Sequence, residues 1–139
     1  AGYFSVMQAA GITPLDSWVK RGEGCFDFGY SAALELLDLP EDQRPTALIT
    51  MNDLMAVGAM QAVQSRGLRV GPDFAIAGFD DAPMVQYLAP GLTTVRQPIV
   101  EVGQRIIPLL LNQLNAEEVP EPTTIMIAPQ LVVRGSTQR

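Results

Sequence analysis

The chain has 139 residues, of which 47% are hydrophobic and 17% are charged, a balance typical of one folded globular domain and not of a disordered chain. Fifteen acidic and nine Lys or Arg residues give a formal net charge of −6, so this stretch is not expected to hold DNA by itself. A single cysteine, Cys25, and the lack of histidine exclude an internal disulfide, a Cys/His zinc cluster and a Cys-His or Ser-His nucleophile.

The first part of the chain predicts two helices. Apolar residues recur at helical spacing over residues 1–10, and Gly11 follows where a left-handed cap is wanted. A short extended piece is expected around residues 18–19. A second apolar helical pattern, over 28–39, ends at Pro40.

The middle of the chain alternates strand and helix. Residues 46–50 form an apolar run of strand type, and Asn52 is a good N-cap for a helix that runs to Gly67. Residues 74–78 form a second strand of buried type. Strand, helix and strand in this order predict a parallel sheet.

The last third is predicted to contain one long helix. Residues 93–96 are extended, and apolar spacing over 99–114 indicates a helix that Pro108 should kink or split. The tail alternates over 123–126 and 131–133, which predicts two short strands or one bent strand. No run reaches the roughly 18 apolar residues of a membrane span, and the start lacks the pattern of a secretion signal.

Polar residues follow both central strands, where open parallel sheets bind ligands. They are Asn52 with Asp53, and Asp80 with Asp81. An amide and a carboxylate together suit a small polyol or nucleobase, a task of binding and not of bond breaking. Alternatively, Asn52 is only a helix cap, and the Asp80-Asp81 pair only ends its strand or offers two oxygens to a divalent cation.

Two aromatic residues flank Asp27 just before the second helix. One of them, Phe26 or Phe28, can stack on a sugar or base, or both can belong to the core. Gly22 and Gly24 lack the spacing of a phosphate loop. The residues therefore predict a protein that is not an enzyme and that carries no metal and no cofactor.

Four blocks of sequence resemble the LacI/GalR family of transcription regulators. Residues 45–59 look like the family's strand and helix that begin in an Asn-Asp pair, and residues 67–81 resemble the next segment, through Ile76-Ala77-Gly78-Phe79-Asp80-Asp81. Residues 87–98 and 129–137 resemble the segments that follow. The blocks lie in order with compatible spacing, while residues 1–39 are similar more loosely, with a loop before Gly29 a residue or two shorter than usual.

The resemblance implies an α/β, periplasmic-binding-protein-like (type I) fold, in which a parallel sheet flanked by helices forms three layers. Residues 1–92 and about 128–139 would belong to the C-terminal subdomain. Residues 93–127 would form a crossover and a helix that packs toward an N-terminal subdomain. The DNA-binding headpiece and an effector-binding Arg expected shortly before Gly2 are not in this sequence.

The resemblance also implies roles for particular residues. The ligand-contacting residues would be Asn52, Asp80, Phe26 as the stacking aromatic, and Gln97 on the crossover. The residues that resemble the family's dimer interface are Val57, Met60, Gln61, Tyr87 and Leu88, with ordinary core as the alternative for Val57 and Met60.

The function implied is that of the effector-binding and dimerisation part of a cytoplasmic, DNA-binding transcription regulator or repressor. Its partners would be a small metabolite, with a sugar or sugar derivative expected, a second copy of the chain, and operator DNA held through the headpiece. The main alternative is a periplasmic sugar-binding protein of a transport system. A metal-dependent hydrolase using Asp80 and Asp81 is a further alternative.

Overall fold

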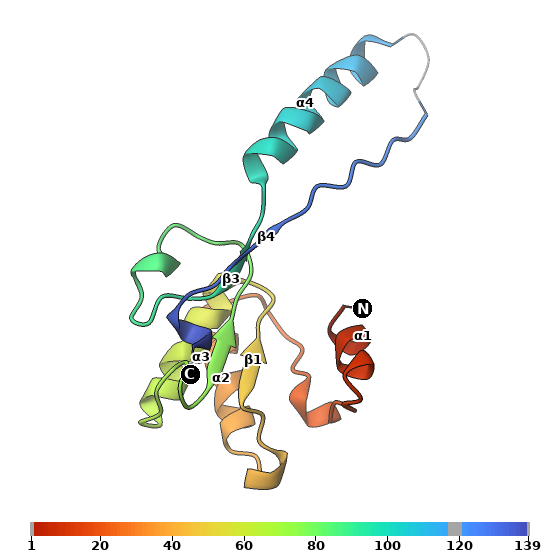
Figure 1. The fold of residues 1–139 in the computed structure, drawn as a ribbon. Helices are drawn as coiled ribbons and strands as arrows, with labels where there is room; N and C mark the ends of the chain where they lie inside the picture. The colour runs from red at the N-terminus through yellow and green to blue at the C-terminus, as the bar shows by residue number, and fades with distance from the viewer. Residues whose placement is uncertain (1, 117–120, 139) are drawn as a thin grey trace.

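A short sheet lies at the centre of the computed structural model, which describes residues 2–116 and 121–138 (Figure 1). Strands β1 (Ala47–Ile49) and β2 (Ala75–Ala77) run parallel, with Leu48 opposite Ile76. Parallel bridges at Ala77–Thr93 and Asp80–Arg96 join β2 to β3 (Thr94–Arg96). Strand β4 (Gln130–Val132) pairs antiparallel with β3. The predicted parallel pairing is thus confirmed for β1 and β2, and isolated parallel bridges continue it toward β3, whose regular partner is the antiparallel β4.

Two helices pack closely against each other, α2 (Phe26–Leu37) and α3 (Asp53–Ser65), and α3 also contacts β2. Glycines at the crossing allow this approach, because a Cβ at Gly29 would lie 2.6 Å from the Met55 Cα. The core combines small residues of the helices with larger ones from the strands and loops. Its buried members include Leu37, Ala56, Ala59, Met60, Val63, Val70, Phe74, Ile76, Val85 and Leu92.

The predicted helix ends are confirmed. Helix α1 (Gly2–Ala9) is followed by Gly11 at φ +70°, and α3 is followed by Gly67 at φ +73°, conformations that glycine adopts without steric cost. The extended piece expected around Trp18 is wrong at that residue. Asp16–Trp18 forms a 3₁₀ turn, and the Trp18 indole Nε1 donates a hydrogen bond of 2.6 Å to the Gln43 carbonyl oxygen, which favours the turn.

Helix α4 (Ile99–Asn115) projects from the body of the molecule, and the segment after residue 120 runs back toward β4 (Figure 1). The helix continues through Pro108 as one element, so the split that this proline could have caused does not occur. No residue of α4, which is described throughout, is buried. Residues 123–126 form no strand, so the tail contributes only β4. Residues 117–120 of the predicted crossover region lie outside the described residues.

Candidate functional site

Asp80 and Gln97 meet beyond the carboxyl ends of two neighbouring parallel strands. Asp80 follows β2 and Gln97 follows β3. The Gln97 Nε2 donates a hydrogen bond of 2.6 Å to the Asp80 Oδ1. The pair is exposed, so a carboxylate and an amide, which together can donate and accept hydrogen bonds, face solvent where open sheets bind ligands.

Asn52 caps α3, and its side chain also contacts a neighbouring loop. Its Oδ1 accepts a hydrogen bond of 2.8 Å from the Met55 backbone N–H, and its Nδ2 donates one of 2.9 Å to the Gly24 carbonyl oxygen. The helix-cap interpretation is therefore confirmed, and the same side chain holds the loop before α2 against the end of β1. Phe26 is the first residue of α2 and is partly buried.

The backbone at Asp80 and Asp81 is unusual. Both residues have positive φ, 123° and 58°, a region that non-glycine residues rarely adopt. Three backbone N–H groups fix this turn: that of Asp80 bonds to the Val95 carbonyl oxygen (3.0 Å), that of Asp81 to the Thr94 Oγ1 (3.3 Å), and that of Ala82 to the Asp53 Oδ2 (2.7 Å). Aspartate tolerates the left-handed φ of Asp81, but the φ of Asp80 lies well beyond that region, so the turn depends on contacts with its neighbours.

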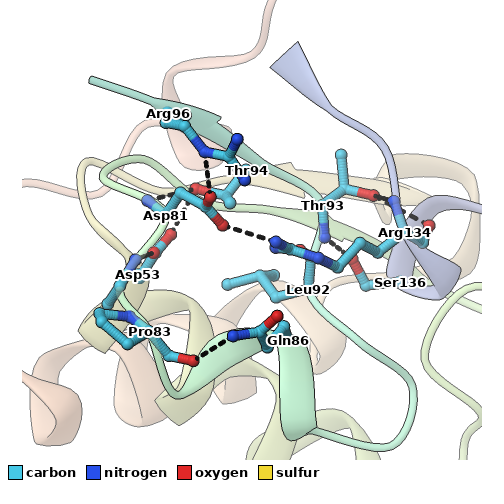
Figure 2. A network of polar contacts seen from close by, with 11 residues as sticks. Asp53, Asp81, Pro83, Gln86, Leu92, Thr93, Thr94, Arg96, Arg134 and Ser136 are labelled. Carbon is cyan, nitrogen blue, oxygen red and sulfur yellow. Dashed lines mark hydrogen bonds and ion pairs between the residues drawn. The ribbon is translucent and has the colours of Figure 1, made fainter. Parts of the chain in front are cut away.

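Asp53 is a buried carboxylate beneath this turn. Only 2% of the residue is exposed, and it lies in the first turn of α3, where a negative charge is favourable. Besides the Ala82 N–H, its Oδ1 accepts a hydrogen bond of 2.6 Å from the Thr94 hydroxyl. Asp53 thus joins the start of α3, the turn after β2 and strand β3 (Figure 2).

The Asp81 carboxylate forms two ion pairs, one with Arg96 and one with Arg134 (Figure 2). The Arg96 Nε lies 2.6 Å from one oxygen and an Arg134 guanidinium nitrogen 2.7 Å from the other, while the Asp81 side chain is only 7% exposed. Arg134 also donates a hydrogen bond of 2.7 Å to the Leu92 carbonyl oxygen. These contacts tie the turn to β3 and to the segment after β4.

Acid should weaken the ion pairs that Asp81 forms with Arg96 and Arg134. Burial raises the pKa of Asp81, but hydrogen bonds from Arg134 and Arg96 outweigh it, so that this pKa lies below its ordinary value. Because the folded pKa is depressed, the stabilisation is fully present above the unfolded pKa of about 4 and is lost as the pH falls through the folded pKa. We expect urea unfolding measured from neutral pH down to acid to show this loss, and Asp81→Asn to remove the corresponding part of it. An acid dependence that Asp81→Asn leaves unchanged would contradict this assignment.

Several residues of this site were not singled out as site residues by the sequence. They are Asp53 as a buried acceptor, together with Thr94, Arg96, Arg134 and Ser136. The Ser136 hydroxyl, fully buried, donates to the Ile76 carbonyl oxygen (2.6 Å) and accepts from the Thr93 N–H (2.8 Å). The contacts join segments 41 to 60 positions apart, and a local pattern carries no such signal.

The predicted interface residues lie in different environments. Tyr87 is 82% exposed, and Gln61 is exposed on α3. Val57 and Leu88 are partly buried against the core. Met60 is 4% exposed and belongs to the core, the alternative left open for it, so it has little surface to offer a partner.

A large apolar groove lies elsewhere, along β1. Its volume is about 740 Å³, and its lining includes Tyr3, Phe4, Trp18, Val19, Ile49 and Met51. None of the four predicted ligand residues lines it. We place the candidate site at Asp80 and Gln97, because polar groups that can orient a ligand converge there and the groove is lined mostly by apolar side chains.

The described residues contain no cluster of three or more His, Cys, Asp or Glu side chains that could hold a metal ion. Asp81, one of the two carboxylates of the hydrolase alternative, is instead engaged by two guanidinium groups. Within the same described ranges, no helix is long and apolar enough to cross a membrane.

The fold and the site together define a class of protein: an α/β domain with polar side chains gathered at the carboxyl ends of parallel strands, of the periplasmic-binding-protein type. Residues 1–137 match the periplasmic binding protein-like domain family, and the chain belongs to this family. It is homologous over nearly its whole length to LacI-family regulators, as the resemblance in its sequence predicted.

Among curated proteins, the transcriptional repressor CytR of Escherichia coli K12 is 37% identical over 137 residues, and the PurR repressor of Edwardsiella ictaluri is 36% identical over 135. These alignments cover 99% and 97% of the chain, but only 39% of either relative. The relatives are repressors and not enzymes. The chain thus spans about two fifths of their length.

Solved structures of LacI-family regulators have the same fold as this chain. A LacI-family regulatory protein from Chloroflexus aggregans superposes with a TM-score of 0.88 at 47% identity, covering 99% of the chain and 48% of that protein. The regulator CelR in complex with cellobiose gives a TM-score of 0.86 at 31% identity, covering 97% and 40%. The Lac repressor dimer bound to operator gives 0.80 at 30% identity, covering 99% and 46%. The predicted fold class is confirmed.

Proposed function

We propose that the chain is the effector-binding and dimerisation part of a LacI-type DNA-binding transcription regulator that senses a small metabolite. The observation that carries the proposal is the exposed Asp80–Gln97 pair beyond the ends of two parallel strands. Homology to repressors supports regulation in preference to solute transport.

A carbohydrate or a related polyol is the proposed ligand class. An ionised carboxylate accepts hydrogen bonds from two neighbouring hydroxyl groups, and the Gln97 amide supplies both a donor and an acceptor beside it. Asn52, at the end of β1, and Phe26, at the start of α2, complete the proposed set of contacts. The structure of the relative CelR with cellobiose supports this choice of ligand class.

Gln97 connects ligand binding with a change of conformation. It lies between β3 and α4, in the segment that leads out of the body of the molecule (Figure 1). A ligand held by Asp80 and Gln97 therefore contacts both the body and this connection. If the ligand binds one arrangement of the connection more tightly than another, it shifts the population of the two. In the full-length protein, we propose, this shift alters operator binding.

Homodimerisation is proposed to use the exposed part of the predicted surface. Tyr87 and Gln61 offer exposed side chains, and Val57 and Leu88 are partly exposed and pack against the core. A large exposed aromatic residue is typical of the centre of a protein interface. The part played by Met60 would be indirect, through the packing of α3.

Replacement of Asp80 tests the proposed site. We expect the full-length protein to bind at least one probe among cellobiose, ribose, glucose 6-phosphate and adenosine in calorimetric titration, and Asp80→Gly to lose that binding. Glycine is the appropriate replacement because it tolerates the φ of +123° while removing the carboxylate. Loss of two charge-assisted hydrogen bonds should weaken binding by roughly 100-fold or more.

The control is Asp42→Gly, an exposed aspartate in a 3₁₀ turn outside the candidate site, which should leave the affinity unchanged. If the protein binds a probe equally well with and without the Asp80 carboxylate, the site is misplaced. A protein that shows no change in operator binding when a probe is bound would favour the transport alternative.

A further inference from the structure

The turn that presents Asp80 is cross-linked to β3 and the residue after it by two adjacent pairs of side chains. Asp80 hydrogen bonds to Gln97, and the next residue, Asp81, forms an ion pair with Arg96, the residue before Gln97. Successive side chains of an extended strand point to opposite faces. The Asp80–Gln97 bond is exposed, whereas in the second pair the Asp81 side chain is only 7% exposed and the Arg96 side chain is 52% exposed.

Asp81 is held by more contacts than Asp80 and Gln97 are, because it pairs with two arginines. Its second partner, Arg134, has a side chain that is only 18% exposed, and hydrogen bonds hold both its backbone and its guanidinium to the Leu92–Thr93 segment. Each arginine contacts a different oxygen of the Asp81 carboxylate, and hydrogen bonds between two charged groups are stronger than neutral ones. By contrast, Asp80 and Gln97 have a single exposed hydrogen bond between them.

The turn needs such support. Asp80 at φ +123° and Asp81 at φ +58° adopt conformations that cost of order 1–3 kcal/mol each and persist only when surrounding contacts impose them. Three hydrogen bonds from backbone N–H groups support the turn, and two of them have acceptors on β3. The ion pair between Asp81 and Arg96 also joins the turn to β3. Without the Asp81 carboxylate, the turn and the Arg96-Gln97 segment are joined through fewer contacts.

From this geometry we infer that Asp81 is a positioning residue, which uses Arg96 and Arg134 to hold Asp80 and Gln97 together in the arrangement that binds the ligand. The inference rests on the proposed function for the identity of the ligand. The side-chain contacts themselves do not depend on that function. Asp81 itself faces the protein and makes no direct contact with the ligand. A preorganised pair loses less entropy on binding, so the role is one of affinity.

The side-chain amide of Gln97 is a direct reporter of this role in the absence of any ligand. In full-length protein labelled with ¹⁵N-glutamine, the Gln97 signals are identified by their loss in Gln97→Ala. Asp80→Gly, which lacks the acceptor, gives the position of the unbonded amide. We expect Asp81→Asn and Asp81→Gly both to move the Gln97 signals most of the way toward that position.

The two Asp81 variants separate charge from backbone strain, since glycine suits φ +58° but cannot form the ion pairs. Asp73→Asn is the matched control, because it breaks another Asp–Arg pair, with Arg69, away from the site, and it should leave the Gln97 signals in place. If the Asp81 variants do not fold, Arg96→Gln is the alternative. It removes the more exposed of the two ion pairs of Asp81 and tests whether the Gln97 signals depend on them. Gln97 signals that stay at the wild-type position in folded variants overturn the inference, even if stability falls.

Ligand titration then separates the inference from the proposed function. With cellobiose, ribose, glucose 6-phosphate or adenosine as the probe, we expect Asp81→Asn to bind roughly tenfold more weakly than the wild type. If the wild type binds none of these probes while the Gln97 signals still move, the proposed ligand class fails and the positioning role stands. If the wild type binds and Asp81→Asn binds equally well, the positioning role fails and the proposed function stands.

Discussion

Gly58→Ala is expected to prevent stable folding, because α2 and α3 cross where no side chain fits. A Cβ at this position would collide with the Phe26 carbonyl oxygen and lie 2.9 Å from the Tyr30 backbone nitrogen. Both neighbours are backbone atoms of α2 and cannot rotate away. The helices would have to separate, and the packing of Ala33, Ala59 and the residues around them would be lost. We expect the free energy of unfolding to fall by about 3 kcal/mol or more.

Urea unfolding followed by circular dichroism measures this change, with Gly103→Ala as the control. Gly103 also lies inside a helix, α4, but a Cβ there meets no atom within 4 Å. The control should therefore show only the gain in helix propensity, up to about 1 kcal/mol of stabilisation. Gly58→Ala and Gly103→Ala proteins of equal stability would show that the helices do not cross as described. Because Phe26 begins α2 at this crossing, the same substitution should also displace a proposed ligand contact.

Asp53→Ala is expected to have the second large effect, since it removes an acceptor shared by two donors. The Thr94 hydroxyl, on a fully buried residue, and the Ala82 backbone N–H both lose their partner. Each unsatisfied donor costs about 1–3 kcal/mol. We expect a loss of about 3 kcal/mol in the free energy of unfolding and, because Ala82 follows the Asp80-Asp81 turn, weaker ligand binding as well.

Asp27→Ala is the matched control for Asp53→Ala. Asp27 is an exposed aspartate in the first turn of α2, so the favourable interaction with the helix dipole, about 0.3–1 kcal/mol, is lost in both variants. The difference between them measures the buried hydrogen bonds. Thr94→Val in combination with Asp53→Ala should cost less than the sum of the single changes, because the two residues share one hydrogen bond. Strict additivity would argue against that bond.

Local patterns in the sequence determined most of the elements. The alternation of apolar strands and amphipathic helices predicted the parallel β1–β2 pair, Asn52 predicted the start of α3, and Gly11 and Gly67 predicted two helix ends. Each of these features depends on residues a few positions apart. The same reasoning was wrong at Trp18, where a hydrogen bond to a residue 25 positions away favours a turn.

The resemblance of sequence blocks 45–137 to the LacI/GalR family identified the fold class and named Asp80 and Gln97. Their hydrogen bond became apparent only in the structure. Position alone did not distinguish the roles of Asp80 and Asp81, two identical neighbouring residues. The structure separates them, because the turn exposes the first and directs the second to two arginines.

The sequence by itself thus determined the class of fold, through the resemblance of its blocks to a known family. It also determined the order of most strands and helices and the place of the polar residues after the strands, because these follow from periodicity and from neighbours along the chain. Only the tertiary structure decided what holds the site together. Asp53, Asp81, Arg134 and Ser136 act on partners up to 60 positions away. Burial makes such partners energetically necessary, but it does not reveal in the sequence which residue will supply them.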